Sequence, residues 1–435
     1  MKSSILITIA LTIQSLFAQN WVEIIPDSGE MPLPRTNAVA IYDSAAHRMV
    51  VFGGRSASGD LNDIWEFDLT TNSWQALMPT DGPTPTPRRT AGSAYDPANH
   101  QMLIWMGQGS GLYNDVWAFD LSQETWTEFS PPDPKPNTRY GVAGIFDPLA
   151  GEVVNFAGFT SNGRFDDTWR FNPAIPEWRD VTPASGSPLR RCLHSASYDS
   201  RDHRMIMYGG TNSGGLNDIW AFDLNQDTWI ELTPADSPEG RFFPTNIYDS
   251  RNHRALIFGG FVRSGSRTND VWAFDLTANT WQQLIPSGDL PVARDGAVGV
   301  YIEDEDRMVI FSGQGGSRLN DVWSLENLSQ PTAIETPGEA SVPTVFELFQ
   351  NFPNPFNPST TIRYNLGKST VVSLKIYNLL GQEIRVLVNE TQSAGQQSVT
   401  WNGRNNFGAP VVSGIYLYRI ETENFTASRK LVLIQ

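Results

Sequence analysis

The sequence predicts an all-β protein in which six repeats of four short strands precede a smaller β-sandwich. Two observations carry the repeat prediction. A tryptophan in the pattern Asn-Asp-x-Trp, once Asp-Asp-x-Trp, recurs every 51 or 52 residues, and a fixed period of this length indicates a repeat architecture. Short apolar and aromatic runs bounded by Asp, Asn, Gly and Pro fill each period without helical periodicity, as in strands joined by turns. The recurring tryptophans are Trp65, Trp117, Trp169, Trp220, Trp272 and Trp323.

The first residues are typical of an export signal. Lys2 supplies a positive charge, an apolar run follows from Ile5 to Leu11, and Ala18 is a small residue suited to cleavage. We expect residues 1–18 to be a signal peptide, removed near the Ala18–Gln19 bond. The run is too short and too interrupted for a membrane span, so we expect no membrane span in the mature chain.

Composition narrows the classes of partner and site. The 435 residues carry a net charge of −16, which argues against a general nucleic-acid binder. Cys192 is the only cysteine, so the chain forms no internal disulfide, and a cysteine-based zinc site is disfavoured.

Each repeat carries further landmarks beside the first tryptophan. In five repeats a second tryptophan follows nine residues later, and a proline follows five residues after that, as in Trp74 and Pro79. An arginine then opens an apolar run that ends in an aromatic residue, and a second run ends in glycine, as in Gly53-Gly54. In the third strand Trp65, Phe67 and Leu69 share one face, while the other face carries smaller residues in most copies, which suits sheets stacked around an axis.

The last repeat lacks its second tryptophan, because position 332 is Thr332. A matching segment, Trp21 to Pro26, stands at the other end of the repeat region. We therefore expect this N-terminal strand to complete the last sheet and to remove an open strand edge.

These residues resemble the kelch family of β-propellers, over about residues 21–325. The Gly-Gly doublets and the spaced aromatic and tryptophan residues carry the resemblance, and three doublets depart from it, at Met106-Gly107, Ala157-Gly158 and Ser312-Gly313. The resemblance implies a six-bladed kelch-type β-propeller, closed by its N-terminal strand, over residues 19–326.

A polar segment with several prolines predicts a linker over residues 327–344. Residues 345–435 then show alternating strands and turns, which predict a small Ig-like β-sandwich. Its Asn354-Pro355-Phe356-Asn357-Pro358 entry, Gly414-to-Tyr418 strand and Lys430-to-Ile434 ending resemble the type A sorting domain of the type IX (Por) secretion system, and a similar sandwich occurs in flagellar hook-cap proteins. This resemblance implies that the domain engages the secretion machinery, and that the protein is secreted from, or displayed on, a Gram-negative-type bacterium. A generic adhesive sandwich is the alternative.

The loops that join strand four to strand one, and strand two to strand three, should meet on one face, which we call the mouth. The repeat arginines and the aspartates of the Asn-Asp pairs lie there, and their recurrence predicts framework pairing. The opposite end, which we call the second face, should carry a solvated row of acids, with no calcium-loop signature. These acids are Asp43, Asp96, Asp147, Asp199, Asp249 and Glu303 to Asp306.

Histidine gives few catalytic candidates. Four recur at one hairpin position of the second face, His47, His100, His203 and His253, and are expected to be structural. His194 is the one polar residue at the third position after the repeat arginine, and Cys192 lies two residues before it on the same strand face. The pair could hold a metal or a nucleophile, but no partner acids accompany it. We therefore predict no catalytic residue, no metal site and no cofactor.

Positions that vary between repeats are the candidates for ligand binding, because loops on a rigid scaffold commonly carry function. Arginine offers bidentate hydrogen bonds to anions, and aromatic rings offer a flat apolar surface. The predicted ligand-binding residues are Arg89, Tyr140, Cys192, His194, Phe242, Phe243, Arg263, Arg267 and Arg318.

The sequence thus predicts a monomeric, non-enzymatic module that binds an extracellular protein or carbohydrate at the mouth. One alternative is a secreted carbohydrate-active enzyme with its site at the propeller mouth. Another is a purely structural surface protein.

Overall fold

The computed structural model of the protein describes residues 19–26, 29–79, 82–329, 346–348, 351, 356, 359–378, 381–393, 395–423 and 425–433. The chain divides into two compact units, Met1–Thr332 and Ala333–Gln435. The predicted signal peptide and most of the predicted linker lie outside the described residues. The described residues form strands and no helix, and so contain no helix long and apolar enough to cross a membrane.

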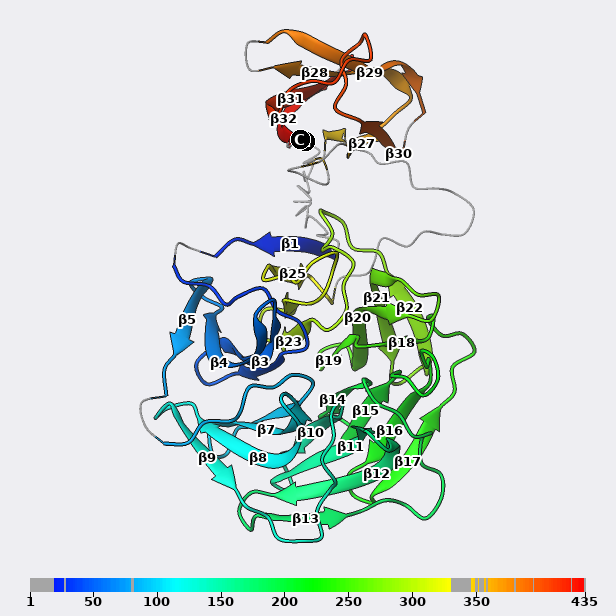
Figure 1. Cartoon of the computed structure of the whole chain (residues 1–435). Coiled ribbons are helices and arrows are strands. Elements are labelled where there is room, and N and C mark those ends of the chain that lie inside the picture. The colour runs from blue at the N-terminus through cyan, green and yellow to red at the C-terminus, as the bar shows by residue number, and fades with distance from the viewer. Residues whose placement is uncertain are drawn as a thin grey trace, which may run out of the picture. The chain divides into compact units, whose positions relative to one another are not determined.

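Within the described part of the first unit, antiparallel strands form six sheets, numbered here in chain order (Figure 1). Sheet 1 contains β2 (Val39–Asp43), β3 (Arg48–Ser56), β4 (Gly59–Asp68) and β5 (Ser73–Leu77). Sheet 2 contains β6 (Gly92–Asp96), β7 (Gln101–Gln108), β8 (Leu112–Asp120) and β9 (Thr125–Phe129). Sheet 3 contains β10 (Ala143–Asp147), β11 (Glu152–Thr160), β12 (Gly163–Asn172) and β13 (Glu177–Asp180).

The next three sheets repeat the arrangement. Sheet 4 contains β14 (Ser195–Asp199), β15 (Arg204–Tyr208), β16 (Ile219–Asp223) and β17 (Thr228–Leu232). Sheet 5 contains β18 (Arg241–Phe242), β19 (Thr245–Asp249), β20 (Arg254–Val262), β21 (Arg267–Asp275) and β22 (Thr280–Leu284). Sheet 6 contains β23 (Val298–Ile302), β24 (Arg307–Phe311), β25 (Val322–Glu326) and β1 (Asn20–Ile24). Five of the six sheets have the four strands per repeat that the sequence predicts, and sheet 5 has in addition the two-residue strand β18.

The six sheets follow one another around an axis, as in a β-propeller (Figure 1). The innermost strands lie side by side in the order β2, β6, β10, β14, β19 and β23, and β23 lies again beside β2. Apolar side chains fill the space between neighbouring sheets, where Trp74 packs on Phe67 of its own sheet and on Phe311 of sheet 6, with ring centroids 4.9 and 4.6 Å apart.

The N-terminal strand closes the ring in the way that its sequence pattern predicts. β1 pairs antiparallel with β25, with Trp21 opposite Leu325 and Ile24 opposite Val322. The Trp21 side chain is buried and packs against Phe258 of sheet 5, at 5.2 Å between ring centroids. The last sheet therefore joins the two ends of the repeat region.

The described part of the second unit contains two antiparallel sheets with an apolar core between them. One sheet contains β26 (Glu347–Leu348), β27 (Thr360–Leu366) and β30 (Gly395–Trp401); the other contains β28 (Thr370–Asn378), β29 (Glu383–Gln392), β31 (Gly414–Glu421) and β32 (Thr426–Leu433). Trp401 and Tyr418 are buried in this core, and Phe356 packs on Trp401. The sequence patterns predict β27, β28, β30 and β31 but do not single out β26, β29 or β32 as strands.

Candidate functional site

The repeat arginines and aspartates form the framework of the mouth, as predicted. In each of the six sheets the arginine donates two hydrogen bonds of 2.6–3.0 Å to the aspartate carboxylate, and its side chain is at most 1% exposed. The same carboxylate accepts the indole N–H of the tryptophan two residues later, at 2.7–2.8 Å. The pairs are Arg35–Asp63, Arg88–Asp115, Arg139–Asp167, Arg191–Asp218, Arg241–Asp270 and Arg294–Asp321.

The same arginines also connect neighbouring sheets. The backbone N–H of Arg88 donates to Leu61 of the preceding sheet, and its carbonyl accepts from the N–H of Gly54 there. A Cβ on Gly53, whose φ is +65°, would lie 2.7 Å from that carbonyl oxygen, which explains the first glycine of the doublet. Burial alone would raise the pKa of Asp218, but the hydrogen bonds and charge of Arg191 hold that pKa below its usual value. These charged groups are therefore committed to the framework and are not free to bind a ligand.

The second residue after each repeat arginine joins a closed ring of backbone hydrogen bonds around the axis. Each N–H donates to the carbonyl of the equivalent residue in the preceding sheet, at 2.7–3.0 Å, and the last donor returns to the first acceptor. All six residues have φ between 53° and 65°. They are Asn37, Thr90, Gly141, Leu193, Phe243 and Gly296. We call this ring the collar.

The residue type at this position varies between repeats, and from sequence alone this variation suggested ligand binding. The collar gives a structural explanation for it. The backbone performs the structural task at this position, so the residue type can differ between repeats where the positive φ and the space allow it. The signal in the sequence was the presence of two glycines and one asparagine, the residues that most readily adopt positive φ.

A cavity of about 110 Å³ lies on the axis beside the collar. It is lined by collar residues and by residues at the third position after the arginine, including Ala38, Val142, His194 and Pro244. The structure therefore brings together two of the predicted ligand-binding residues, His194 and Phe243, at the centre of the mouth.

Two of the four arginines among the predicted ligand-binding residues are paired. Arg89 donates to Asp60 of the preceding sheet and to Gln108, and Arg267 donates to Asp295 of the following sheet at 2.7 Å. The partners belong to neighbouring sheets and vary between repeats, so the repeat pattern does not reveal them. Among the described residues, Arg263 and Arg318 form no ion pair, and Arg263 is exposed.

The aromatic residues of the mouth form two clusters. Phe242 stacks on Phe261 with ring centroids 5.2 Å apart and also contacts Phe243, and the guanidinium of Arg267 lies 5.6 Å from the centre of the Phe261 ring. Across the mouth, Tyr140 contacts Phe159 edge-on at 5.5 Å, and Arg164 lies over the same ring at 5.3 Å. Phe159, Arg164 and Phe261 are strand two and strand three residues that the sequence reasoning did not select as site residues.

The pKa shifts of the Cys192 and His194 side chains disfavour a reactive pair. Burial raises the pKa of the Cys192 thiol, which disfavours the thiolate. Burial, and then the nearby charge of Arg191, lowers the pKa of His194 to about 3, so its ring is neutral at physiological pH. Neither ring nitrogen forms a hydrogen bond of ordinary geometry, and the ring packs edge-on against Phe156.

The predicted solvated acidic row on the second face is wrong for its five aspartates. Asp43, Asp96, Asp147, Asp199 and Asp249 are all fully buried. Asp43 illustrates the reason: it accepts from the N–H of Ala45, from Arg48, and from Tyr95 and His100 of the next repeat. The acids thus cap turns and connect sheets. The recurrent histidines share this structural role, as predicted, since His203 binds Asp147 and His253 binds Asp199 in the same way.

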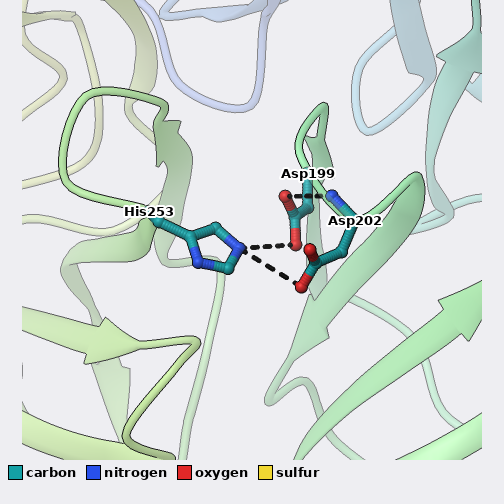
Figure 2. Close-up of side chains that lie close together, drawn as sticks. All are labelled: Asp199, Asp202 and His253. Atoms are coloured by element: carbon teal, nitrogen blue, oxygen red, sulfur yellow. Dashed lines mark hydrogen bonds and ion pairs between the residues drawn. The ribbon is translucent and has the colours of Figure 1, made fainter.

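One group on this face has a metal-like composition. The ring of His253 lies 3.3 Å from Asp199 and 3.4 Å from Asp202, as Figure 2 shows. However, Arg204 also bonds both carboxylates, at 2.8 and 2.9 Å, and so already supplies a positive charge to them. The contact between His253 and Asp199 repeats the His100–Asp43 contact, which indicates a connection between sheets and not a metal site.

Comparisons with known proteins agree with this architecture. The family model of the KLHDC2/KLHL20/DRC7 kelch-repeats domain matches residues 8–198 and 151–344, and that of the FlgD Ig-like domain matches residues 358–425. The FlgD match supports an Ig-like second unit and shows no sorting domain.

Three curated relatives each match about two thirds of this chain. The chain is 25% identical over 315 residues to the leucine-zipper-like transcriptional regulator 1 homolog of Drosophila melanogaster, covering 68% of this chain and 31% of that protein. It is 26% identical to the dynein alpha chain, flagellar outer arm, of Chlamydomonas reinhardtii, covering 68% and 7%. It is 23% identical to the host cell factor homolog hcf-1 of Caenorhabditis elegans, covering 71% and 38%. The match thus spans less than two-fifths of each relative.

Proposed function

Because this chain belongs to the KLHDC2/KLHL20/DRC7 kelch-repeats domain family, we propose that it is a non-enzymatic module that binds a protein segment at its mouth. Kelch repeats typically act as protein-interaction scaffolds, and relatives in the comparisons are named as regulators and as a motor chain. We further propose that the six sheets are the full set of blades.

The observation that carries this proposal is the aromatic and cationic cluster on sheet 5. Phe242 and Phe261 offer stacked rings that are only partly buried, and the exposed Arg263 follows on the same strand-two end. Aromatic and arginine side chains on a rigid scaffold are the residues that most often dominate protein recognition. Arg263 and Arg318 lack an acidic partner among the described residues, so they favour a segment that carries carboxylates.

A carbohydrate is the second candidate ligand, because the Phe242 ring also offers a flat apolar surface for a sugar ring. The enzymatic alternative has less support. The buried Cys192 thiol and the neutral, buried His194 are poorly suited to nucleophilic catalysis, since a nucleophile needs a thiolate or an adjacent base.

We also propose that residues 345–435 direct export of the chain through the type IX secretion system, and that the protein acts outside the cell as a monomer. The motifs noted above support this proposal, together with an Ig-like fold compatible with a separate sorting unit.

The experiment is a protein and glycan array screen with the full mature chain, followed by titration of the hits with Arg263→Ala and Phe242→Ala. Each variant should weaken binding by about tenfold, as for a central contact residue. Arg201→Ala is a matched control, because Arg201 is an exposed arginine on the second face. If Arg201→Ala abolishes binding and the two mouth variants bind like the parent, the ligand occupies the other face.

A further inference from the structure

A cavity among the described residues opens on the second face, opposite the mouth. It has a volume of about 460 Å³ and lies between the ends of the innermost strands. This volume falls within the range of small-molecule sites. The seventh residue after each repeat arginine contributes an aromatic ring to its wall. These residues are Tyr42, Tyr95, Phe146, Tyr198, Tyr248 and Tyr301.

Two of the tyrosine hydroxyls of this wall, those of Tyr42 and Tyr95, have hydrogen-bond partners beside the cavity. Tyr95 donates to Asp43 at 3.2 Å. The Tyr42 hydroxyl lies 2.9 Å from Nδ1 of His47, and it donates there when His47 is neutral with its proton on Nε2, which lies 3.0 Å from Glu305. A phenol that donates its proton keeps its oxygen lone pairs for a ligand. These two hydroxyls therefore keep lone pairs that can accept a hydrogen bond from a ligand.

Buried carboxylates lie close to the phenols of this wall. Burial, followed by the Asp43 carboxylate, raises the pKa of Tyr95 to about 12. Burial and the carboxylates Asp147 and Asp199 raise the pKa of Tyr198 in the same direction. A raised phenol pKa reports both burial and nearby negative charge, and the two act together here.

The charge of the lining is one-sided. Glu303 is its one charged residue among the described residues, and it is exposed to solvent. Neither lysine, arginine nor histidine lines the cavity there. Aromatic rings attract cations through their π-electrons, and the adjacent carboxylate adds to that attraction.

We propose that this cavity binds an organic cation, an ammonium or guanidinium group on an apolar stem. The cation would lie between the six aromatic side chains of the wall and the Glu303 carboxylate. The site is separate from the mouth, so one chain could engage two ligands at opposite ends of the axis. A free amine and the basic side chain of a partner present the same chemistry.

The test uses the full mature chain and saturation-transfer NMR with n-butylamine and with Nα-acetyl-lysinamide as probes. Binding of both indicates a small-molecule site, whereas binding of the second alone indicates recognition of a basic side chain; either result supports the cation site. Nε-acetylation of the second probe removes its charge while leaving the stem in place. We expect that modification to abolish the signal.

Variants test the location of the site. Glu303→Gln should weaken binding by about fivefold, the upper range for one solvent-accessible charge pair. Tyr198→Leu should weaken it by about threefold through loss of one ring. Asp304→Asn is the matched control, because Asp304 is an exposed neighbouring acid that does not line the cavity, and it should leave binding within twofold.

Thermal unfolding midpoints of the variants show whether each remains folded. Equal binding of the charged and acetylated probes would overturn the proposal, as would unchanged binding in both folded lining variants. Binding of a neutral sugar such as glucose, without any response to the cations, would also overturn it. None of these results depends on ligand binding at the mouth.

Discussion

Replacement of His194 by alanine should remove a pH-dependent loss of stability. His194 occupies the position at which other repeats carry Ala38, Ala91 and Ala297. Its side chain is 6% exposed, its ring packs 5.4 Å from Phe156, and neither ring nitrogen has a hydrogen-bond partner of ordinary geometry. The site therefore accommodates a neutral imidazole and opposes a charged one.

The magnitude follows from the pKa. In the folded protein burial, with the charge of Arg191, lowers the pKa of His194 from 6.5 to about 3. Between these two values the unfolded chain binds a proton that the folded chain does not, so acidification favours unfolding. The contribution is complete above pH 6.5 and falls by about 1.4 kcal/mol per pH unit below it, which amounts to about 2 kcal/mol at pH 5.

The assay is urea unfolding of the mature chain and of His194→Ala, followed by tryptophan fluorescence at pH 8, 6 and 5. All other titrating groups are common to the two proteins, so the difference between their pH dependences isolates His194. The parent should lose about 2 kcal/mol more than the variant between pH 8 and pH 5.

A second variant, His194→Val, separates the charge from the cavity that alanine leaves, because Val142 occupies the same position in sheet 3. Both variants should show the same shallow pH dependence, whatever their stability at pH 8. Parallel curves for parent and variants would refute the reasoning, because they would mean that folded His194 accepts a proton as readily as the unfolded chain does.

Three further predictions concern closure, the collar and the second unit. Trp21→Ala should lower the free energy of unfolding by about 3–5 kcal/mol, because the Trp21 side chain is buried. Val22→Ala, on the exposed side of the same strand, should change that free energy little. Equal effects of the two variants in chemical unfolding would argue against closure by β1. Gly296→Ala should destabilise the protein by about 1–3 kcal/mol, because φ is +63° and the new Cβ would lie 2.2 Å from Asn37 Oδ1. Asn37→Gly, at φ +55°, should be tolerated, and calorimetry that ranks the two variants in the opposite order would contradict the collar. A chain ending at Ser329 should fold. In a host with the sorting pathway, cell fractionation should find this chain in the periplasm. Delivery of the chain to the surface without residues 345–435 would disprove the sorting role of those residues.

The endpoint of that truncation comes from the structure. The sequence pattern places the linker at residue 327, but Leu328 is buried, and its carbonyl accepts hydrogen bonds from Gln19 and Arg254. A chain that stops at residue 327 would lose these contacts. The boundary could not be located from sequence because Leu328 lies within a polar, proline-containing segment.

The repeat architecture and its framework could be predicted from sequence. The arginine and the aspartate recur 27 to 29 residues apart in every copy, and a pair that recurs in phase in six copies is expected to share one contact. The closing strand was predictable for the same reason, since its pattern supplies what the sixth copy lacks. The strands of each repeat and the strand that closes the ring can thus be predicted from local patterns, because these patterns recur at a constant spacing.

The candidate sites depend on contacts between sheets, which repetition does not encode. Arg89 and Arg267 pair with acids in neighbouring sheets. Two of the four arginines among the predicted ligand-binding residues are therefore neutralised. The five aspartates of the second face are buried because the next repeat covers them, although in sequence they resemble solvated turn acids.

By itself the sequence determined the all-β repeat fold, its closing strand and the framework pairs, because each depends on residues that recur at a constant spacing. The tertiary structure alone decided that the collar is made by backbone, that His194 is buried and neutral, and that the wider axial cavity opens on the second face. The physical reason is that burial and charge at these places are set by how one sheet packs against the next.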